Sequence, residues 1–522
     1  MMKRIKLSYL SALLSCLVSS VWAAEVSDSL KYSHITGLAT TYTFNYPSKN
    51  AAGEDIVLSS SLVVWTPDHP QETDSIESLH IYSHFTITSD DECPSSEYNI
   101  KENALFTVLL KGEYALGTNP AQNFISRGII IAPDFEGYGV SRDVPHPYLS
   151  QELTARQMSD AVEYGLKLYQ KHVNDKRALP FKSDWRSYGF GFSQGGAVAL
   201  AVQRYLEEQG LDEQLRYHGT LCGDGPYDLI ATLRYYLEDD GDSYGQQTNH
   251  RKGQTTMPMV IPMIVKGMLD THPAMKNHAL TDYLSQQFLD TGIMDWLESK
   301  YYVINDIHEM WYEQLQEGLE ANGRTYTKEQ MAELFSSPKE DRVCANLDKL
   351  FSPGLYEYLQ NIDNTDPFQM EGNAYADLHR AMIDNSLCTG WEPKHRIQFV
   401  HSRGDMVVPF SNYLSFRDAH PGGEGVLYRV DDSITSDHID TGVVFYLYLT
   451  TMGTYGKYFQ WFDEGETTDI AEVKNERMKS EDSDNAIYDL CGRKVNSSLF
   501  ILHSSLKKKG IYIVNGKKVA IK

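Results

Sequence analysis

One stretch of the sequence, "YGFGFSQGGAVAL" at residues 188–200, constrains the fold more than any other. An apolar run of strand character ends in Ser193, and a run of helical character begins directly behind it. A strand that turns straight into a helix forces its corner residue into strained backbone angles, and Gly191 and Gly195 leave the space that such a corner needs. The pattern predicts that Ser193 is held at the carboxyl edge of a parallel sheet, at the positive end of a helix.

Runs of strand and helix character alternate on both sides of this corner. Strands joined by helices through short links are typical of a mostly parallel sheet covered by helices on both faces. The sequence therefore predicts an α/β fold of this kind. The strand-like runs are 79–84, 128–133, 187–192, 218–223, 396–402 and 425–430, and the helix-like runs are 152–173, 195–210 and 441–453.

A long segment between the two alternating regions has a different pattern. Residues 227–390 contain helical runs and polar loops without a clear strand. We therefore expect one α/β domain in two parts, 25–226 and 391–465, interrupted by a helical cap insertion at 227–390. The insertion follows the strand after the Ser193 helix and enters at the carboxyl edge, where open α/β sheets bind ligands. It should lie over Ser193.

Three apolar runs in the insertion, at 257–265, 288–297 and 308–312, carry more Met and aromatic character than a solvated cover needs. Methionine adapts to varied apolar shapes. The runs could line an acyl-chain pocket, or they could form the core of the insertion itself. The sequence leaves both interpretations open.

The two ends of the chain have compositions of their own. Lys3, Arg4 and Lys6 precede an apolar stretch that ends in small residues, which predicts a secretory signal peptide at 1–24 and a secreted or cell-surface protein. A lipid-attachment site at Cys16 is the alternative. No later run reaches the length of about 18 apolar residues that a membrane-spanning helix needs.

The tail divides into two parts. Residues 466–485 form a charged stretch poor in apolar residues, which indicates a solvated linker. Residues 486–522 return to strand character and contain Asn515-Gly516, a favourable hairpin turn. The sequence therefore predicts a small β-rich module at the C-terminus.

The net charge bears on possible partners, and the cysteines and histidines bear on disulfides and metal sites. The formal net charge of −24 repels nucleic acid and anionic lipid surfaces, so we expect no nucleic-acid partner. Five cysteines follow the signal peptide, and export permits disulfides, of which Cys344–Cys388 is the expected pair. No cysteine or histidine spacing indicates a metal site.

A serine hydroxyl is a poor nucleophile without a base, so a histidine and an orienting carboxylate must accompany Ser193. Asp405 follows a strand-like run on the same sheet edge, and His438 stands in a polar stretch just before an apolar helix. Asp224, one strand earlier, is the alternative acid. The order Ser193, Asp405, His438 is that of α/β-hydrolases.

The tetrahedral intermediate of acyl transfer needs hydrogen-bond donors for its oxyanion. One expected donor is the backbone N–H of Gln194, the residue after the nucleophile. The other should come from the loop after His84, where Phe85 or Thr86 is the candidate. The Thr86 hydroxyl could add a further bond.

Longer motifs carry a family resemblance. The segments "YSHFT…CPS", "GIIIAPDFEGYGVSRDVPHPYL" and "GFGFSQGGAVAL" resemble the secretory lipase family of α/β-hydrolases. The resemblance implies carboxylic ester hydrolysis, a helical cap over the pocket and no cofactor. Phe85 departs from the family, which commonly has glycine there. The tail, residues 467–522, is similar to the C-terminal sorting modules of the type IX secretion route, which implies secretion machinery as a partner.

The leading functional hypothesis is a secreted serine hydrolase that cleaves carboxylic esters of small molecules or lipids. Ser193 would form the acyl-enzyme, His438 would act as base, and Asp405 would orient the histidine. A serine peptidase of the prolyl-peptidase type is one alternative, although fewer than 170 residues between signal and serine leave no room for its propeller. A binding protein on a hydrolase fold without catalysis is the other.

Overall fold

The computed structural model describes residues 24–36, 39–67, 69–102, 127–242, 244–339, 342–450 and 456–464, and four short strands between 487 and 521. Cys16, the linker at 466–485 and all but the last residue of the expected signal peptide lie outside these residues. In the described part of the chain, no helix combines the length and apolar character required to span a membrane. The chain divides into two compact units, 1–462 and 463–522.

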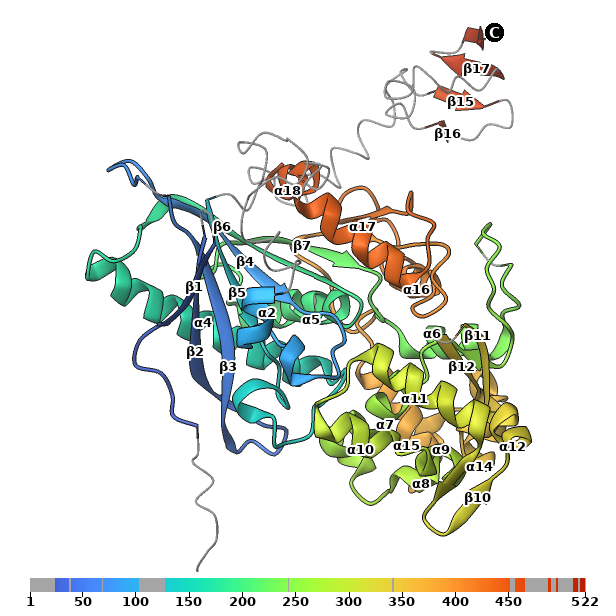
Figure 1. Cartoon of the computed structure of the whole chain (residues 1–522). Helices are drawn as coiled ribbons and strands as arrows, with labels where there is room; N and C mark the ends of the chain where they lie inside the picture. The colour runs from blue at the N-terminus through green and yellow to red at the C-terminus, as the bar shows by residue number, and fades with distance from the viewer. Residues whose placement is uncertain are drawn as a thin grey trace, which may run out of the picture. The chain divides into compact units, whose positions relative to one another are not determined.

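The first unit is built on a nine-stranded sheet with the order β1-β2-β3-β5-β4-β6-β7-β13-β14 (Figure 1). Pairs from β1 to β5 along this order are antiparallel, and all pairs from β5 to β14 are parallel. The predicted fold class, a mostly parallel sheet flanked by helices, is confirmed. The strands are β1 (Lys31–Thr36), β2 (Ala39–Lys49), β3 (Asp55–Trp65), β4 (Ile76–Ser83), β5 (Gly128–Pro133), β6 (Phe181–Phe192), β7 (Tyr217–Gly223), β13 (Arg396–Val400) and β14 (Tyr428–Asp431).

The three antiparallel strands at the start of the sheet were not among the predicted ones. Their sequences mix polar and apolar residues, and β3 buries three consecutive serines, Ser59 to Ser61, beside apolar neighbours. Buried hydroxyls of this kind remove the apolar signal that marks β5, whose six residues are all buried. The antiparallel part of the sheet therefore escaped a search for apolar runs.

Helices cover both faces of the sheet (Figure 1). On one face lie α4 (Gln151–Asn174) and α5 (Gln194–Gln209), and a Cβ at Gly165 of α4 would lie 3.1 Å from Ile131 of β5. On the other face, Ile130 and Ala132 share a core with α17 (His438–Thr450) and α18 (Gly456–Asp463). Successive residues of β5 thus pack on opposite layers, as a strand requires. A further helix, α16 (Ser411–Ala419), lies between β13 and β14 in the chain.

Residues 227–390 form a mainly helical insertion, whose buried apolar core also includes Tyr148 and Leu149 (Figure 1). The expectation that it lacks strands is wrong. Strands β8 (Gln254–Thr255), β11 (Phe335–Lys339) and β12 (Arg342–Asn346) form a three-stranded sheet, and β9 (Leu319–Ala321) pairs with β10 (Arg324–Tyr326). These strands have two to five residues, too short to show a periodic pattern. The helices are α6 (Leu229–Glu238), α7 (Val260–Thr271), α8 (Leu280–Tyr283), α9 (Gln286–Asp290), α10 (Ile293–Ser299), α11 (Ile304–Glu317), α12 (Lys328–Leu334), α13 (Leu347–Leu350), α14 (Pro353–Leu359) and α15 (Ala374–Asp384).

The expected Cys344–Cys388 disulfide is not formed. Both cysteines are buried free thiols, as are Cys93 and Cys222. Cys344 lies on β12, whereas the Cys388 thiol donates to the carbonyl of Tyr227, 3.6 Å away. Closeness of the two cysteines in the sequence was no guide to their distance in the fold.

The second unit contains four short strands, β15 (Ile487–Asp489), β16 (Lys494–Val495), β17 (Gly510–Val514) and β18 (Lys517–Ile521). They form one antiparallel sheet in the order β16-β15-β17-β18. Val514 pairs with Lys517, so the two strands are joined by Asn515 and Gly516, which lie outside the described residues.

Candidate active site

Ser193 occupies a strained corner between β6 and α5. Its φ of 58° and ψ of −126° lie in a region that residues with a side chain rarely adopt. A Cβ at Gly191 would lie 2.3 Å from the carbonyl oxygen of Gly195, and one at Gly195 would lie 2.1 Å from the carbonyl oxygen of Ser83. Both glycines are therefore required by close backbone contacts, which is the reason the sequence suggested for them.

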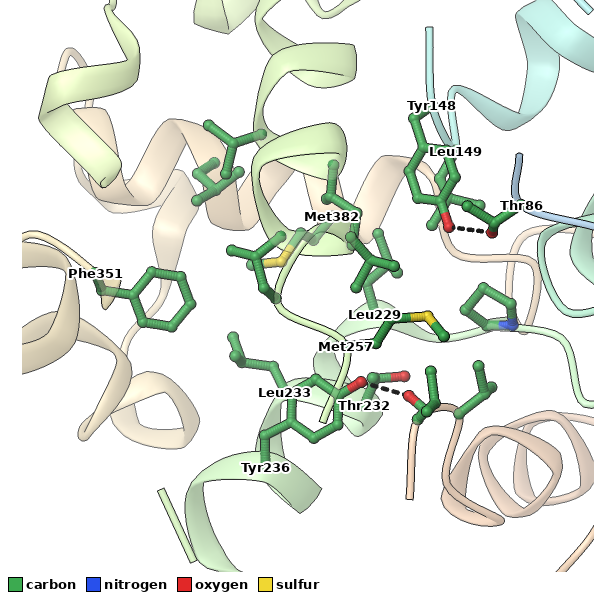
Figure 2. Close-up of a pocket in the computed structure, with 18 of the residues that line it drawn as sticks. Thr86, Tyr148, Leu149, Leu229, Thr232, Leu233, Tyr236, Met257, Phe351 and Met382 are labelled. Carbon is green, nitrogen blue, oxygen red and sulfur yellow. Dashed lines mark hydrogen bonds between the residues drawn. The ribbon is translucent and has the colours of Figure 1, made fainter. Parts of the chain in front are cut away.

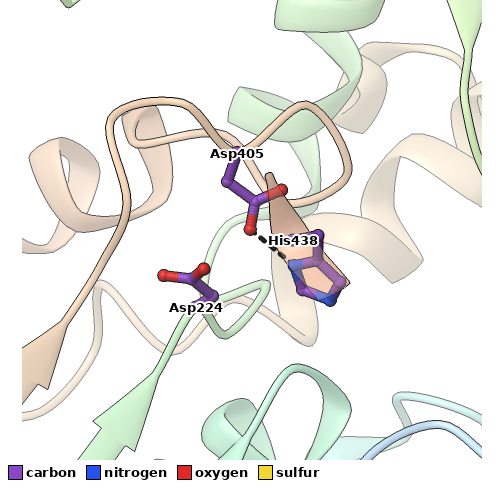
Figure 3. A group of neighbouring side chains, drawn as sticks. All are labelled: Asp224, Asp405 and His438. Carbon is purple, nitrogen blue, oxygen red and sulfur yellow. Dashed lines mark hydrogen bonds and ion pairs between the residues drawn. The ribbon is translucent and has the colours of Figure 1, made fainter. Parts of the chain in front are cut away.

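The structure brings Ser193, His438 and Asp405 together from three separate elements. Nε2 of His438, the first residue of α17, lies 2.8 Å from Oγ of Ser193. Nδ1 of the same ring lies 2.5 Å from Oδ2 of Asp405, which follows β13 (Figure 3). All three side chains are buried. They form a continuous hydrogen-bonded chain from carboxylate to hydroxyl.

The Asp405 carboxylate is fixed on both oxygens. Its Oδ1 accepts the backbone N–H groups of Val407 and Val408, at 2.7 and 2.9 Å. Burial alone would raise the pKa of Asp405, but the adjacent His438 ring and the hydrogen bonds hold it below its ordinary value. The Phe192 ring packs against the His438 ring, with 5.0 Å between the two ring centroids. This arrangement keeps an ionised carboxylate beside the histidine.

Asp224, the alternative acid, lies close to the hydrogen-bonded residues Asp405 and His438 but is not bonded to His438. It follows β7, and its Oδ1 accepts the backbone N–H of Ser402 at 2.8 Å. Among the described residues, Asp224, Asp405 and His438 form the one cluster with metal-ligand spacing, with ligand atoms within 4.8 Å of one another. The hydrogen bond between His438 and Asp405 explains the short distances in this cluster. Asp405, rather than Asp224, contacts the histidine.

The three oxyanion-hole candidates are placed differently. Gln194 is the first residue of α5, so its backbone N–H has no acceptor within the helix. Thr86 lines the same cavity as Ser193, and its Oγ1 is hydrogen-bonded to the Tyr148 hydroxyl at 2.8 Å (Figure 2). The Phe85 side chain instead packs on the Tyr446 ring, 6.3 Å between centroids. Of the two loop residues, Thr86 is therefore the one that faces the cavity with its side chain.

The sequence reasoning assigned no role to two residues that support this site, His146 and Tyr148. Nδ1 of His146 donates to the carbonyl of Glu136 at 2.7 Å, and Nε2 lies 2.9 Å from the side-chain amide nitrogen of Gln194. Burial lowers the pKa of His146 to about 3, so the ring is neutral and Nε2 accepts from Gln194. Both residues belong to the "HPYL" segment, whose signal lay in the family resemblance alone.

An apolar cavity that Ser193 lines extends into the helical insertion. Figure 2 shows most of the residues that line it. Its wall is mostly apolar, and much of it comes from α6, α7, α14 and α15, with Tyr148, Leu149, Val407 and Val408 among the other lining residues. Of the three apolar runs in the insertion, 257–265 lines the cavity with Met257, Val260, Ile261, Ile264 and Val265. The other two, at 288–297 and 308–312, pack in the core of the insertion. Run 257–265 also belongs to this core, so the same run lines the cavity and packs in the interior of the insertion.

No protein-family model matches the sequence, and no curated protein matches it either. Solved structures with a similar fold include the rice cell wall degrading esterase LipA from Xanthomonas oryzae, with a TM-score of 0.58, 17% identity, and coverage of 84% of this chain and 98% of that chain. For a Legionella pneumophila protein the TM-score is 0.52 at 16% identity, covering 83% of this chain and 91% of that chain. At these identities the likeness shows the fold. The chain has an α/β-hydrolase fold.

Proposed function

We propose that this protein is a serine hydrolase that cleaves carboxylic esters. One observation supports the proposal above all, the hydrogen-bonded chain from Asp405 through His438 to a serine held at a strained strand–helix corner. A strained corner is costly and persists where function needs it. The name of the Xanthomonas oryzae neighbour, an esterase, agrees with this assignment.

In the first half of the proposed reaction, Ser193 Oγ attacks the ester carbonyl carbon while Nε2 of His438 takes the hydroxyl proton. The carbonyl electron pair moves to oxygen. The backbone N–H of Gln194 and the hydroxyl of Thr86 stabilise the oxyanion that forms. Asp405 stabilises the imidazolium by its charge and its hydrogen bond to Nδ1. Collapse of the intermediate breaks the ester C–O bond, and His438 returns the proton to the leaving alcohol.

In the second half, a water molecule takes the place of the alcohol. His438 removes its proton, the hydroxide attacks the acyl-Ser193 carbonyl, and a second oxyanion forms in the same place. Its collapse breaks the bond to Ser193 Oγ, which recovers its proton from His438 as the carboxylic acid leaves. One ester and one water thus give one alcohol and one acid, and no cofactor is required.

The cavity indicates which part of the substrate the insertion binds. Its mostly apolar wall offers almost no hydrogen-bond donors or acceptors beyond Thr86, Thr232 and the two tyrosines Tyr148 and Tyr236. A peptide chain would bury unpaired amide groups there at high cost, whereas an acyl chain would gain about 0.8 kcal/mol per buried methylene. We therefore propose that the acyl chain of the ester occupies this cavity, and we favour an esterase over a peptidase.

The test is a substrate panel of p-nitrophenyl esters from acetyl to long acyl chains, together with aminoacyl p-nitroanilides. We expect kcat/KM to rise several-fold for each two added carbons until the cavity is filled, with no turnover of the anilides. Ser193→Ala should abolish both turnover and labelling by a fluorophosphonate probe. Preferred cleavage of the anilides would make the protein a peptidase. Failure of the native protein to react with the probe would make it a binding protein.

A further inference from the structure

Asp224 lies at the carboxyl edge of the sheet, just after the strand that separates those preceding Ser193 and Asp405. It directly follows β7, which pairs with β6 on one side and β13 on the other. Its side chain is completely buried, and its φ of 33° is unusual for a residue with a side chain. Its backbone N–H donates to the carbonyl of Val400 at 2.9 Å. A strained, buried acid at such a place requires an explanation.

The two carboxyl oxygens of Asp224 have different surroundings. Oδ1 accepts the backbone N–H of Ser402 at 2.8 Å. Oδ2 is buried, and among the described residues it has no hydrogen-bond donor. The carboxylate of Asp405 lies next to Asp224, with ligand atoms of the two side chains within 4.8 Å of each other (Figure 3). An ionised Asp224 would therefore place an unpaired oxygen against a second negative charge.

Among the residues that the structure describes, no positively charged group lies beside Asp224 to compensate such a charge. The titratable groups that face Asp224 are Asp405, His438, His401 and the Tyr227 hydroxyl. Nε2 of His401 lies 4.0 Å from Oδ1 of Asp224 and is used in a 2.9 Å hydrogen bond to the carbonyl of Val408. Burial lowers the pKa of His401 to about 4, so the ring is neutral. His438 is bonded to Asp405.

Two carboxyl groups this close in a dry site cannot both be ionised, and one must hold a proton. The Asp405 carboxylate accepts three N–H groups, from Val407, Val408 and His438, whereas Asp224 accepts one from Ser402. The charge is stabilised where more donors converge, so the proton belongs to Asp224. Burial and the neighbouring Asp405 charge raise the pKa of Asp224 well above its ordinary value, in agreement with this assignment.

We infer that Asp224 is a neutral carboxylic acid whose Oδ2–H donates to the Asp405 carboxylate and holds it against His438. It is a positioning residue in the reaction, and this role rests on the proposed serine-hydrolase function. Asp224 and Asp405 then form a pair of carboxyl groups that together carry one negative charge. The fourth donor on Asp405 keeps that carboxylate ionised and oriented when His438 takes up the serine proton.

The test compares two replacements of Asp224. Asp224→Asn preserves the geometry, because the amide oxygen can accept from Ser402 and the amide N–H can donate to Asp405. Asp224→Leu has a similar size but no donor. We expect Asn to lower kcat by less than about fivefold and Leu to lower it by about 10- to 100-fold, the loss that one missing hydrogen bond to a charged group produces, with little change in KM. The acid limb of the kcat/KM profile should stay where it is in Asp224→Asn, because a neutral group has replaced a neutral group.

Several results would overturn the assignment. An acid limb that moves down by more than about one pH unit in Asp224→Asn would show that a negative charge had been removed beside His438. Equal activity of the Leu and Asn variants would show that no donor is needed. A readout independent of turnover is the infrared carbonyl band of a protonated carboxyl group at pH 7, measured in the full-length protein. The difference spectrum between Ser193→Ala and the double variant with Asp224→Asn should contain this band, even if the native protein hydrolyses no ester, and a difference spectrum without it would refute the proposal.

Discussion

The catalytic edge of the sheet and the cavity wall in the helical insertion are built from opposite kinds of contact. At the edge, Ser193, His438 and Asp405 are joined by hydrogen bonds of 2.8 and 2.5 Å, and two further N–H groups fix the acid. The cavity wall is formed mostly by apolar side chains, which impose shape with few directional hydrogen bonds. We infer that the edge determines the reaction and the wall determines the substrate. Changes at the edge should therefore affect all esters alike, whereas changes at the wall should alter their ranking.

The largest effect is expected from Asp405→Asn. An amide at this position favours the wrong histidine tautomer, and such a change lowers kcat by about 10⁴-fold in a serine hydrolase triad. If the edge acts as one unit, acetyl and long-chain esters should lose activity by the same factor, measured as kcat for each. Asp418→Asn, an exposed aspartate paired with Arg417, is the matched control and should retain activity. A loss confined to long-chain esters would contradict the division between edge and wall.

Thr86→Val should have the next largest effect. Thr86 is the predicted oxyanion residue whose hydroxyl faces the cavity, and the loss of one oxyanion donor costs about 10²-fold or more in kcat. The comparison is with Thr88→Val, since Thr88 Oγ1 donates to the carbonyl of Tyr302 and does not line the cavity. Measured with acetyl and long-chain esters, the loss should again be uniform. Equal and small losses in the two variants would mean that the oxyanion is held by backbone N–H groups alone.

The arrangement of Ser193, Asp405 and His438 could be predicted residue by residue because the signals that place these residues are local in the sequence. Gly191 and Gly195 mark the strained corner, and the apolar runs before Asp405 and after His438 place both residues at the correct ends of their elements. Short-range signals of this kind survive folding because they arise from backbone geometry. The choice of Asp405 over Asp224 agrees with the contact to His438.

Other parts of the site depend on contacts between distant segments and could not be predicted in this way. His146 meets Gln194 48 positions away in the chain, and Tyr148 meets Thr86 at a separation of 62. Which apolar run of the insertion lines the cavity is decided by helix packing, since all three runs have similar composition. The insertion's short strands and the free Cys344 and Cys388 thiols also follow from this packing.

A change at the cavity wall should separate the substrates. Ile261→Trp would fill part of the cavity lined by α7, and we expect kcat/KM for long-chain esters to fall about 10- to 50-fold, the equivalent of two or three methylenes that can no longer be buried. Acetyl esters should be affected less than about threefold. Ile304→Trp at the start of α11, outside the cavity, is the matched control. Thermal unfolding of both variants shows whether overpacking, rather than lost binding, explains the result.

The last prediction concerns the stability of the sheet in acid. Burial lowers the pKa values of His80 and His146 to about 3 and those of His84 and His401 to about 4, and all four lie in the sheet part of the first unit. Because these folded values lie below the unfolded value of about 6.5, the unfolded chain binds more protons between pH 6.5 and 4. The free energy of unfolding should therefore fall as the pH falls through this range, by up to about 1.4 kcal/mol per pH unit for each histidine. His80→Asn, on the buried strand β4, should remove one histidine's share of this slope in denaturant titrations at pH 7, 6 and 5. An unchanged slope in His80→Asn would mean that His80 takes up its proton in the folded sheet, and the acid sensitivity would then have to arise elsewhere in the molecule.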